Sequence, residues 1–168
     1  ERHARSDRPR FAGWWGHDQA SRFKMGPDFV PTPGADGWQL SNPPILGLAP
    51  LRASLDVFSQ AGMPALREKS ERLTGALETL IHERLADTLR IVTPSDPAQR
   101  GCQLSLRVLQ GRGLSGRDAG RSLLEYLGAQ GVLGDWREPD TIRISPAPLY
   151  NTYADVLRFV RGIEAWRA

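Results

Sequence analysis

The stretch Gln103-Leu104-Ser105-Leu106-Arg107-Val108-Leu109 alternates apolar and polar side chains over most of its length. A period of two places Leu104, Leu106 and Val108 on one face of an extended segment, and Ser105 and Arg107 on the other. This pattern predicts a strand that has one face in a hydrophobic core.

The residues directly after this strand predict a tight turn and a helix. Gly111-Arg112-Gly113 favours a hairpin-like turn, and Ser115 is a suitable N-cap for a helix over 116–129. Gly131 is expected to end that helix. We expect a further strand to begin at Val132-Leu133.

Two more elements are expected toward the C-terminus. A strand over 141–145 follows a turn at 138–140, where a proline and two acidic residues meet. Asn151 is expected to cap a last helix. Apolar spacing predicts that its inward-facing residues are Tyr153, Val156, Leu157, Val160 and Ile163.

Upstream of the first strand the sequence predicts a short strand within 87–94 and two helices. The second helix has Pro64 in its first turn. Its apolar stripe consists of Leu66, Leu73, Leu77, Leu80, Ile81 and Leu85. The first helix begins at Ile45, contains Pro50, which could bend it, and ends or bends at Gly62.

Residues 1–44 are rich in glycine, proline and tryptophan and predict an irregular segment. We expect its aromatic side chains to pack on a surface that the chain itself does not supply. Mixed helices and strands around a small sheet indicate an α+β fold. The expected division is an irregular segment over 1–44, connecting helices over 45–86 and a small domain over 87–168.

Composition excludes several classes of protein. The 168 residues are 40% hydrophobic and 24% charged, with a net charge of +3 and acidic residues interspersed among the basic ones, so we expect no nucleic-acid partner. No apolar run is long enough to span a membrane, and no signal peptide is expected. Cys102 is the only cysteine, which indicates a reduced, cytoplasmic setting, and no metal-binding motif is present.

Two segments combine residues that suit ligand binding. In Gly13-Trp14-Trp15-Gly16-His17-Asp18 an indole N–H can donate to an anionic group, although an aromatic plug in an interface is the alternative. In the segment 142–151, Arg143 lies between two β-branched residues and faces away from the core if they face inward. Its guanidinium can bind a carboxylate bidentately, with a surface ion pair as the alternative.

Together with the residues between them, these segments resemble the kynureninase family. The similar stretches occur in the same order and extend over almost the whole chain. They are Phe11-Ala12-Gly13-Trp14-Trp15-Gly16-His17-Asp18, Ser21-Arg22-Phe23-Lys24-Met25, Gly37-Trp38-Gln39-Leu40-Ser41-Asn42-Pro43-Pro44-Ile45-Leu46, Arg100-Gly101-Cys102-Gln103-Leu104 and Ile142-Arg143-Ile144-Ser145-Pro146-Ala147-Pro148-Leu149-Tyr150-Asn151.

The resemblance implies the aspartate-aminotransferase-like fold of pyridoxal-phosphate enzymes. Residues 1–44 would be an active-site and interface segment at the end of the large domain, and 87–168 the small C-terminal domain. The implied enzyme is a homodimeric, cytoplasmic hydrolase of carbon–carbon bonds. It converts L-kynurenine or 3-hydroxykynurenine to anthranilate or 3-hydroxyanthranilate and L-alanine, in the kynurenine pathway of tryptophan catabolism and NAD biosynthesis.

The resemblance also assigns roles to individual residues. Trp14 and Asn42 align with residues that reach the pyridoxal-phosphate cofactor from the neighbouring subunit, and Asn42 also with a contact to the aromatic side of the substrate. Arg143 aligns with the arginine that binds the substrate α-carboxylate.

The lysine that binds the cofactor covalently is implied to lie upstream of Glu1. We therefore expect no catalytic residue within the chain, and we expect the isolated chain to be inactive. Lys24 and Lys69, its two lysines, do not correspond to that lysine. The alternative hypothesis is a catalytically inactive, truncated homologue that acts as an interaction module.

Overall fold

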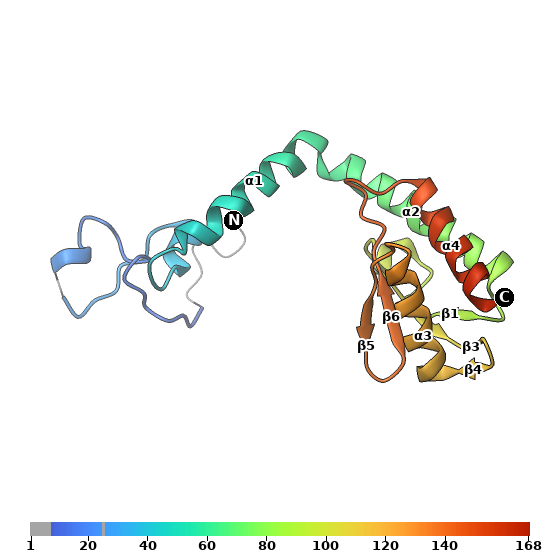
Figure 1. The fold of residues 1–168 in the computed structure, drawn as a ribbon. Coiled ribbons are helices and arrows are strands. Elements are labelled where there is room, and N and C mark those ends of the chain that lie inside the picture. Colours follow the sequence, from blue (N-terminus) through green and yellow to red (C-terminus); the bar gives the residue numbers. More distant parts are fainter. Residues whose placement is uncertain (1–7, 25) are drawn as a thin grey trace. The chain divides into compact units, whose positions relative to one another are not determined.

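The computed structural model describes residues 8–24 and 26–168. The chain divides into two compact units, Glu1–Leu55 and Asp56–Ala168. The elements, shown in Figure 1, are η1 (Arg22–Lys24), η2 (Gly34–Trp38), α1 (Ile45–Ala61), α2 (Met63–Arg84), β1 (Leu89–Ile91), η3 (Pro97–Gln99), β2 (Leu104–Val108), β3 (Gln110–Gly111), β4 (Leu114–Ser115), α3 (Gly116–Ala129), β5 (Asp135–Arg137), β6 (Thr141–Ile144) and α4 (Tyr153–Arg167).

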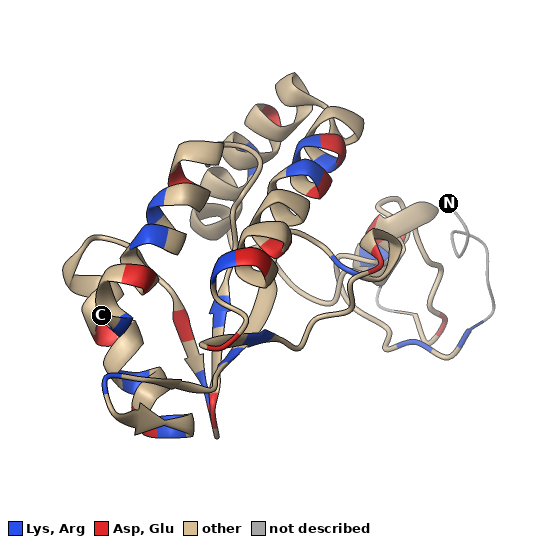
Figure 2. Ribbon diagram, turned by 90° about the vertical axis from the view of Figure 1, so that its right-hand side faces the viewer, with Lys and Arg blue, Asp and Glu red and all other residues tan. Residues whose placement is uncertain are grey.

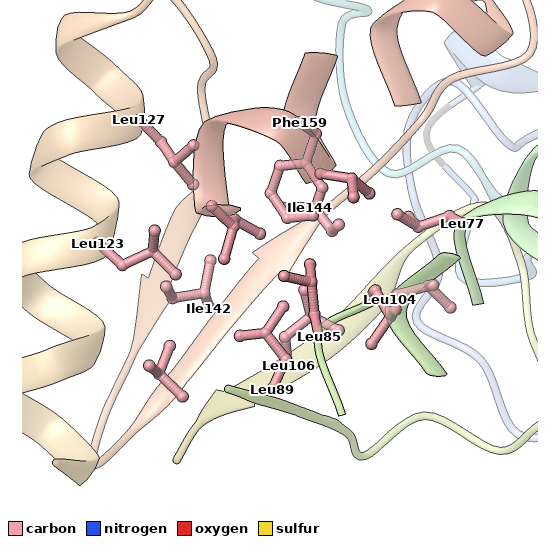
Figure 3. Packing of buried hydrophobic residues seen from close by; sticks show 14 of the residues in the cluster. Leu77, Leu85, Leu89, Leu104, Leu106, Leu123, Leu127, Ile142, Ile144 and Phe159 are labelled. Carbon is pink, nitrogen blue, oxygen red and sulfur yellow. The ribbon is translucent and has the colours of Figure 1, made fainter. Parts of the chain in front are cut away.

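The second unit is built on a four-stranded antiparallel sheet with the strand order β1-β2-β6-β5. Its inner face packs against α2, α3 and α4, and Figure 3 shows the apolar side chains that meet there. Leu104, Leu106 and Val108 are buried in this core, which confirms the strand and the inward face predicted from their alternation. The fold is α+β, as predicted.

The outer face of the sheet carries only polar side chains within the strands. The register places them in two rows across the sheet, because every second residue of a strand points to the same side. One row holds Ser105, Arg143 and Asp135, and the other holds Arg90, Arg107, Thr141 and Arg137.

Helix α3 is confirmed over 116–129, but the strand expected at Val132-Leu133 is wrong. Gly131 has a φ of +73°, its N–H donates to Gly128 O at 3.0 Å, and Val132 N–H donates to Leu127 O at 2.9 Å. This is a Schellman motif, in which the residue after the glycine still belongs to the helix cap. Val132 therefore has no N–H free for a sheet, and the strand begins three residues later, at Asp135.

Helix α4 begins one residue later than expected. Thr152, not Asn151, is the N-cap, and it forms a capping box with Asp155. The Asn151 side chain instead accepts a hydrogen bond from Ala147 N–H at 2.8 Å, which closes the turn before the helix. Tyr153 is 54% exposed and does not face inward, because it lies in the first turn, beyond the core.

Two core residues of α4 were missing from the expected set. Phe159 and Trp166 are buried, and Trp166 is the largest of the fully buried side chains. Its indole N–H donates to Ser122 Oγ of α3 at 3.2 Å. The buried face of the helix is therefore shifted toward Phe159 and Trp166 and away from Tyr153, relative to the face that the expected set predicted.

The two upstream helices form as predicted. Gly62, with a φ of +79°, separates α1 from α2, and Pro64 lies in the first turn of α2. Pro50 lies inside α1 without ending it. The predicted stripe of α2 packs on the sheet and on α4, whereas no residue of α1 is buried.

No helix in the described part of the chain combines the length and apolarity that crossing a bilayer requires. Basic and acidic residues are interspersed along the helices of the second unit, as Figure 2 shows. Within residues 8–24 and 26–168 no cluster of three or more histidine, cysteine or carboxylate side chains could hold a metal ion.

Candidate active-site residues

Trp14 lies in a tight turn of the first unit, and two glycines permit this turn. A Cβ on Gly13 would lie 2.3 Å from Leu40 Cα, and one on Gly16 would lie 2.8 Å from Gly37 O. Both glycines therefore let the turn pack backbone to backbone against the segment that leads to Asn42.

The Trp14 side chain is 43% exposed and meets the Phe23 ring edge to face, with 5.3 Å between the centroids. Its indole N–H has no hydrogen-bond partner among the described residues. Trp14 also lines a concavity of about 300 Å³, together with Ala12, Gly13, His17, Arg22, Gly26, Pro27, Asp28 and Phe29. The ring thus offers one face and an unused donor.

Asn42 is held by the neighbour of Trp14. The indole N–H of Trp15 donates to Asn42 Oδ1. The Arg22 guanidinium lies 4.6 Å from the centroid of the Trp15 ring, and its Nη2 donates to Trp15 O at 3.1 Å and to His17 O at 3.0 Å. Sequence reasoning did not assign a role to Trp15, and the only signal for it was its position beside Trp14 between two glycines.

Arg143 lies on β6, on the outer face of the sheet. Ile142 and Ile144 on either side are buried, so the orientation predicted for Arg143 is confirmed. Its side chain is 29% exposed. Its direct cross-strand neighbours are Ser105 on β2 and Asp135 on β5.

The guanidinium of Arg143 is paired with Asp135. Arg143 Nε donates to Asp135 Oδ2 at 2.8 Å, and Nη2 donates to the same oxygen. Arg137 Nε lies 3.1 Å from this oxygen. The hydrogen bond from Arg143, with a further contribution from Arg137, lowers the pKa of the Asp135 carboxyl below its ordinary value. The acidic neighbour considered as an alternative is thus present.

One edge of the guanidinium nevertheless stays available. Nη1 of Arg143 has no hydrogen-bond partner among the described residues. Since the Asp135 contacts use Nε and one N–H of Nη2, the end formed by Nη1 and the second N–H of Nη2 can still bind a carboxylate bidentately.

The segment after Arg143 borders a second concavity. Its volume is about 370 Å³, and its walls include Ile144, Ser145, Pro146, Tyr150, Asn151 and Arg158. Arg158 Nη2 donates to Gln130 O at 2.6 Å. The Pro146 to Asn151 turn therefore forms one wall of this hollow, whose lining includes Ile144 on the inner side of the sheet but not the Arg143 side chain.

Arg100 and the two lysines, which the sequence analysis also named, lie apart from the candidate site residues in their contacts. Arg100 is almost completely buried and pairs with Glu78 of α2 at 2.7 Å, which attaches the loop before β2 to the helix. Lys24 is exposed and Lys69 is half-buried on α2. Trp14 and Asn42 belong to the first unit and Arg143 to the second.

Comparison with known proteins identifies relatives along the whole chain. Residues 66–163 match the model of the kynureninase C-terminal domain. A kynureninase of Xanthomonas campestris pv. campestris (strain B100) is 66% identical over 167 residues, which cover 99% of this chain and 38% of the relative. The chain thus spans well under half the length of the kynureninases it matches.

Solved structures share the fold. A cysteine desulfurase of Thermococcus onnurineus has a TM-score of 0.65 at 16% identity, covering 83% of this chain and 35% of that one. The Escherichia coli cysteine desulfurase CsdA has a TM-score of 0.63 at 18% identity, covering 94% and 38%. A variant of C-DES, with glycine covalently linked to its pyridoxal-phosphate cofactor, has a TM-score of 0.56 at 19% identity, covering 94% and 38%.

These neighbours bear out the aspartate-aminotransferase-like fold that the resemblance implied. The residues that match the C-terminal-domain model all lie within the second unit. The matched model covers more than half of the sequence, and its description agrees with the family implied by the ordered motifs. The chain belongs to the kynureninase family and contains its C-terminal domain.

Proposed function

We propose that this chain is the C-terminal part of an enzyme that hydrolyses L-kynurenine or 3-hydroxykynurenine to an anthranilate and L-alanine. The observation that carries the proposal is the 66% identity to a kynureninase over 99% of the chain. The proposed enzyme is a cytoplasmic homodimer whose active site lies at the subunit interface.

Pyridoxal phosphate is the proposed cofactor, and the exposed residues of the first unit fit it chemically. Trp14 presents an aromatic face and an unused N–H donor, which suit an anionic, planar group. Asn42, held by Trp15 through Oδ1, donates neither N–H of its amide to another residue in the described ranges, so both can donate to a ligand. The cofactor, when bound, supplies the electron sink for bond cleavage beside the substrate amine.

Arg143 is proposed to bind the substrate α-carboxylate. A bidentate contact to its free edge fixes the orientation of the substrate Cα, and that orientation selects which bond is broken. Asn42 is proposed to contact the aromatic side of the substrate. In this scheme Arg143, Trp14 and Asn42 position reactants, and the covalent chemistry belongs to a lysine outside this chain.

The direct test uses the complete polypeptide that contains this sequence, loaded with pyridoxal phosphate. Formation of anthranilate and L-alanine from L-kynurenine is expected. Arg143→Lys should lower kcat/KM by about tenfold or more, because lysine cannot form the bidentate contact. Arg107→Lys, on the same face of the sheet but paired with Asp140, is the matched control and should keep its activity. An unchanged kcat/KM in Arg143→Lys contradicts the proposed role.

A further inference from the structure

The contacts of the Arg143 guanidinium indicate a role for Asp135. The two residues are direct partners in the register of β5 and β6, so the backbone ladder fixes the separation of their Cα atoms. Asp135 lies at the edge of the sheet, and its side chain is 48% exposed. An exposed ion pair adds little to stability, which makes the arrangement of the contacts more informative than their strength.

The contacts are confined to one side of the guanidinium. Asp135 Oδ2 accepts from both Nε and Nη2 of Arg143, whereas Nη1 has no partner in the described part of the chain. A planar guanidinium held along its Nε side can no longer rotate freely about its last torsion angles. Its opposite end then points in one direction, with two N–H groups parallel.

The local charge remains favourable for an anion. Asp135 is shared between Arg143 and Arg137, so the three side chains together carry one net positive charge. A carboxylate that bound to the free end of Arg143 would not have to displace Asp135, because the two carboxylates occupy different edges. Asp135 thus orients Arg143 without neutralising the cluster.

We propose that Asp135 is a positioning residue for the carboxylate clamp: it holds the Nε side of Arg143 so that the Nη1 end is presented to the α-carboxylate of the substrate. The inference rests on the proposed function of Arg143. It predicts that losing Asp135 disorders the arginine and weakens the recognition of the carboxylate in particular.

The experiment compares Asp135→Ala and Asp135→Asn in the complete cofactor-loaded polypeptide. KM and kcat are measured with L-kynurenine. The inhibition constant is measured for the decarboxylated amine of kynurenine, which lacks the carboxylate. Asp140→Ala is the matched control, because Asp140 pairs with Arg107 in the other row of the same face, at 3.1 Å.

Asp135→Ala should raise KM about tenfold, with a smaller change in kcat and none in the inhibition constant of the amine. Asp135→Asn should retain most of the affinity because the amide oxygen still accepts a hydrogen bond. Asp140→Ala should match the unmodified protein. Thermal unfolding of each variant shows whether the fold is intact.

Two results overturn the assignment. A lower KM in Asp135→Ala would mean that Asp135 competes with the substrate for Arg143. An equal loss of affinity for kynurenine and for the amine would mean that Asp135 only supports the sheet. The variant Arg143→Lys distinguishes a failure of the positioning role of Asp135 from a failure of the proposed function of Arg143. If Arg143→Lys weakens kynurenine binding and Asp135→Ala does not, the clamp stands and the positioning role falls.

Discussion

At the scale of single residues, the indole of Trp15 can be used to test whether Asn42 binds a ligand. Its N–H donates to Asn42 Oδ1, and the amide N–H groups of Asn42 make no hydrogen bond to another described residue, so they can donate to a ligand. Trp15→Phe replaces the indole by a phenyl ring that can still lie against Arg22 but has no N–H donor. We expect KM for L-kynurenine to rise about threefold to tenfold, as for the loss of one hydrogen bond.

A double-mutant cycle with Asn42→Ala checks that Trp15 acts through Asn42. Trp15→Phe should have no further effect on KM once Asn42 is absent, and additive effects would contradict the coupling. Trp14→Phe provides the contrast, since that indole N–H has no partner among described residues. It should weaken cofactor retention, measured by equilibrium dialysis, without altering the Trp15–Asn42 pair.

Gly111 shows how closely one residue can be constrained. A Cβ at this position would lie 2.1 Å from Cζ3 of Trp166, whose ring is fully buried and cannot move away. Gly111→Ala should therefore destabilise the second unit by about 2 kcal/mol, as expected for overpacking. Gly128→Ala is the control within α3, where a Cβ meets nothing within 4 Å. It should stabilise by about 0.5 kcal/mol. Urea unfolding measures both changes.

At the scale of elements, the start of α4 depends on the reciprocal contacts of Thr152 and Asp155. Thr152→Ala should cost about 1 kcal/mol in the free energy of unfolding, because it removes the side-chain cap. Ser115→Ala is the matched control: Ser115 precedes α3, but its side chain makes no capping hydrogen bond. An equal loss at both positions would contradict the capping role of Thr152.

The same cap should respond to pH. Asp155 accepts hydrogen bonds from the backbone N–H and the hydroxyl of Thr152, and these contacts lower its pKa below the ordinary aspartate value. A carboxyl with a lowered folded-state pKa stabilises the fold fully above its ordinary pKa. That contribution is lost as the pH falls through the lowered value. Asp155→Asn should flatten this part of the curve of unfolding free energy against pH.

Local sequence patterns predict some elements of this fold and not others. Alternation identified β2, and helical spacing identified α2 and α3, because both signals are local. The start of β5 was missed because the hydrogen bonds of the Schellman motif at Gly131 decide it. Trp166 was missed although it lies three residues after Ile163, at helical spacing; only its partner, Ser122 of α3, lies beyond what a local period can indicate.

At the scale of the molecule, the ordered motifs predicted the family and the fold before any geometry. They also singled out Trp14, Asn42 and Arg143, whose roles remain predictions. They did not indicate that Asp135 pairs with Arg143 or that Trp15 pairs with Asn42. Asp135 meets Arg143 only through strand register, and Trp15 meets Asn42 across 27 positions in the sequence. Such partners follow from tertiary pairing, which spacing alone does not specify.

The order of the strands has a consequence for association between molecules. The outermost strands of the four-stranded sheet, β1 and β5, have three residues each and carry Arg90, or Asp135 and Arg137, on the outer face. Short, charged border strands resist the addition of a strand from a second molecule, which is the first step toward fibrils. The Asp135 carboxylate, proposed to orient Arg143, is therefore also one of the edge charges that oppose the addition of a further strand.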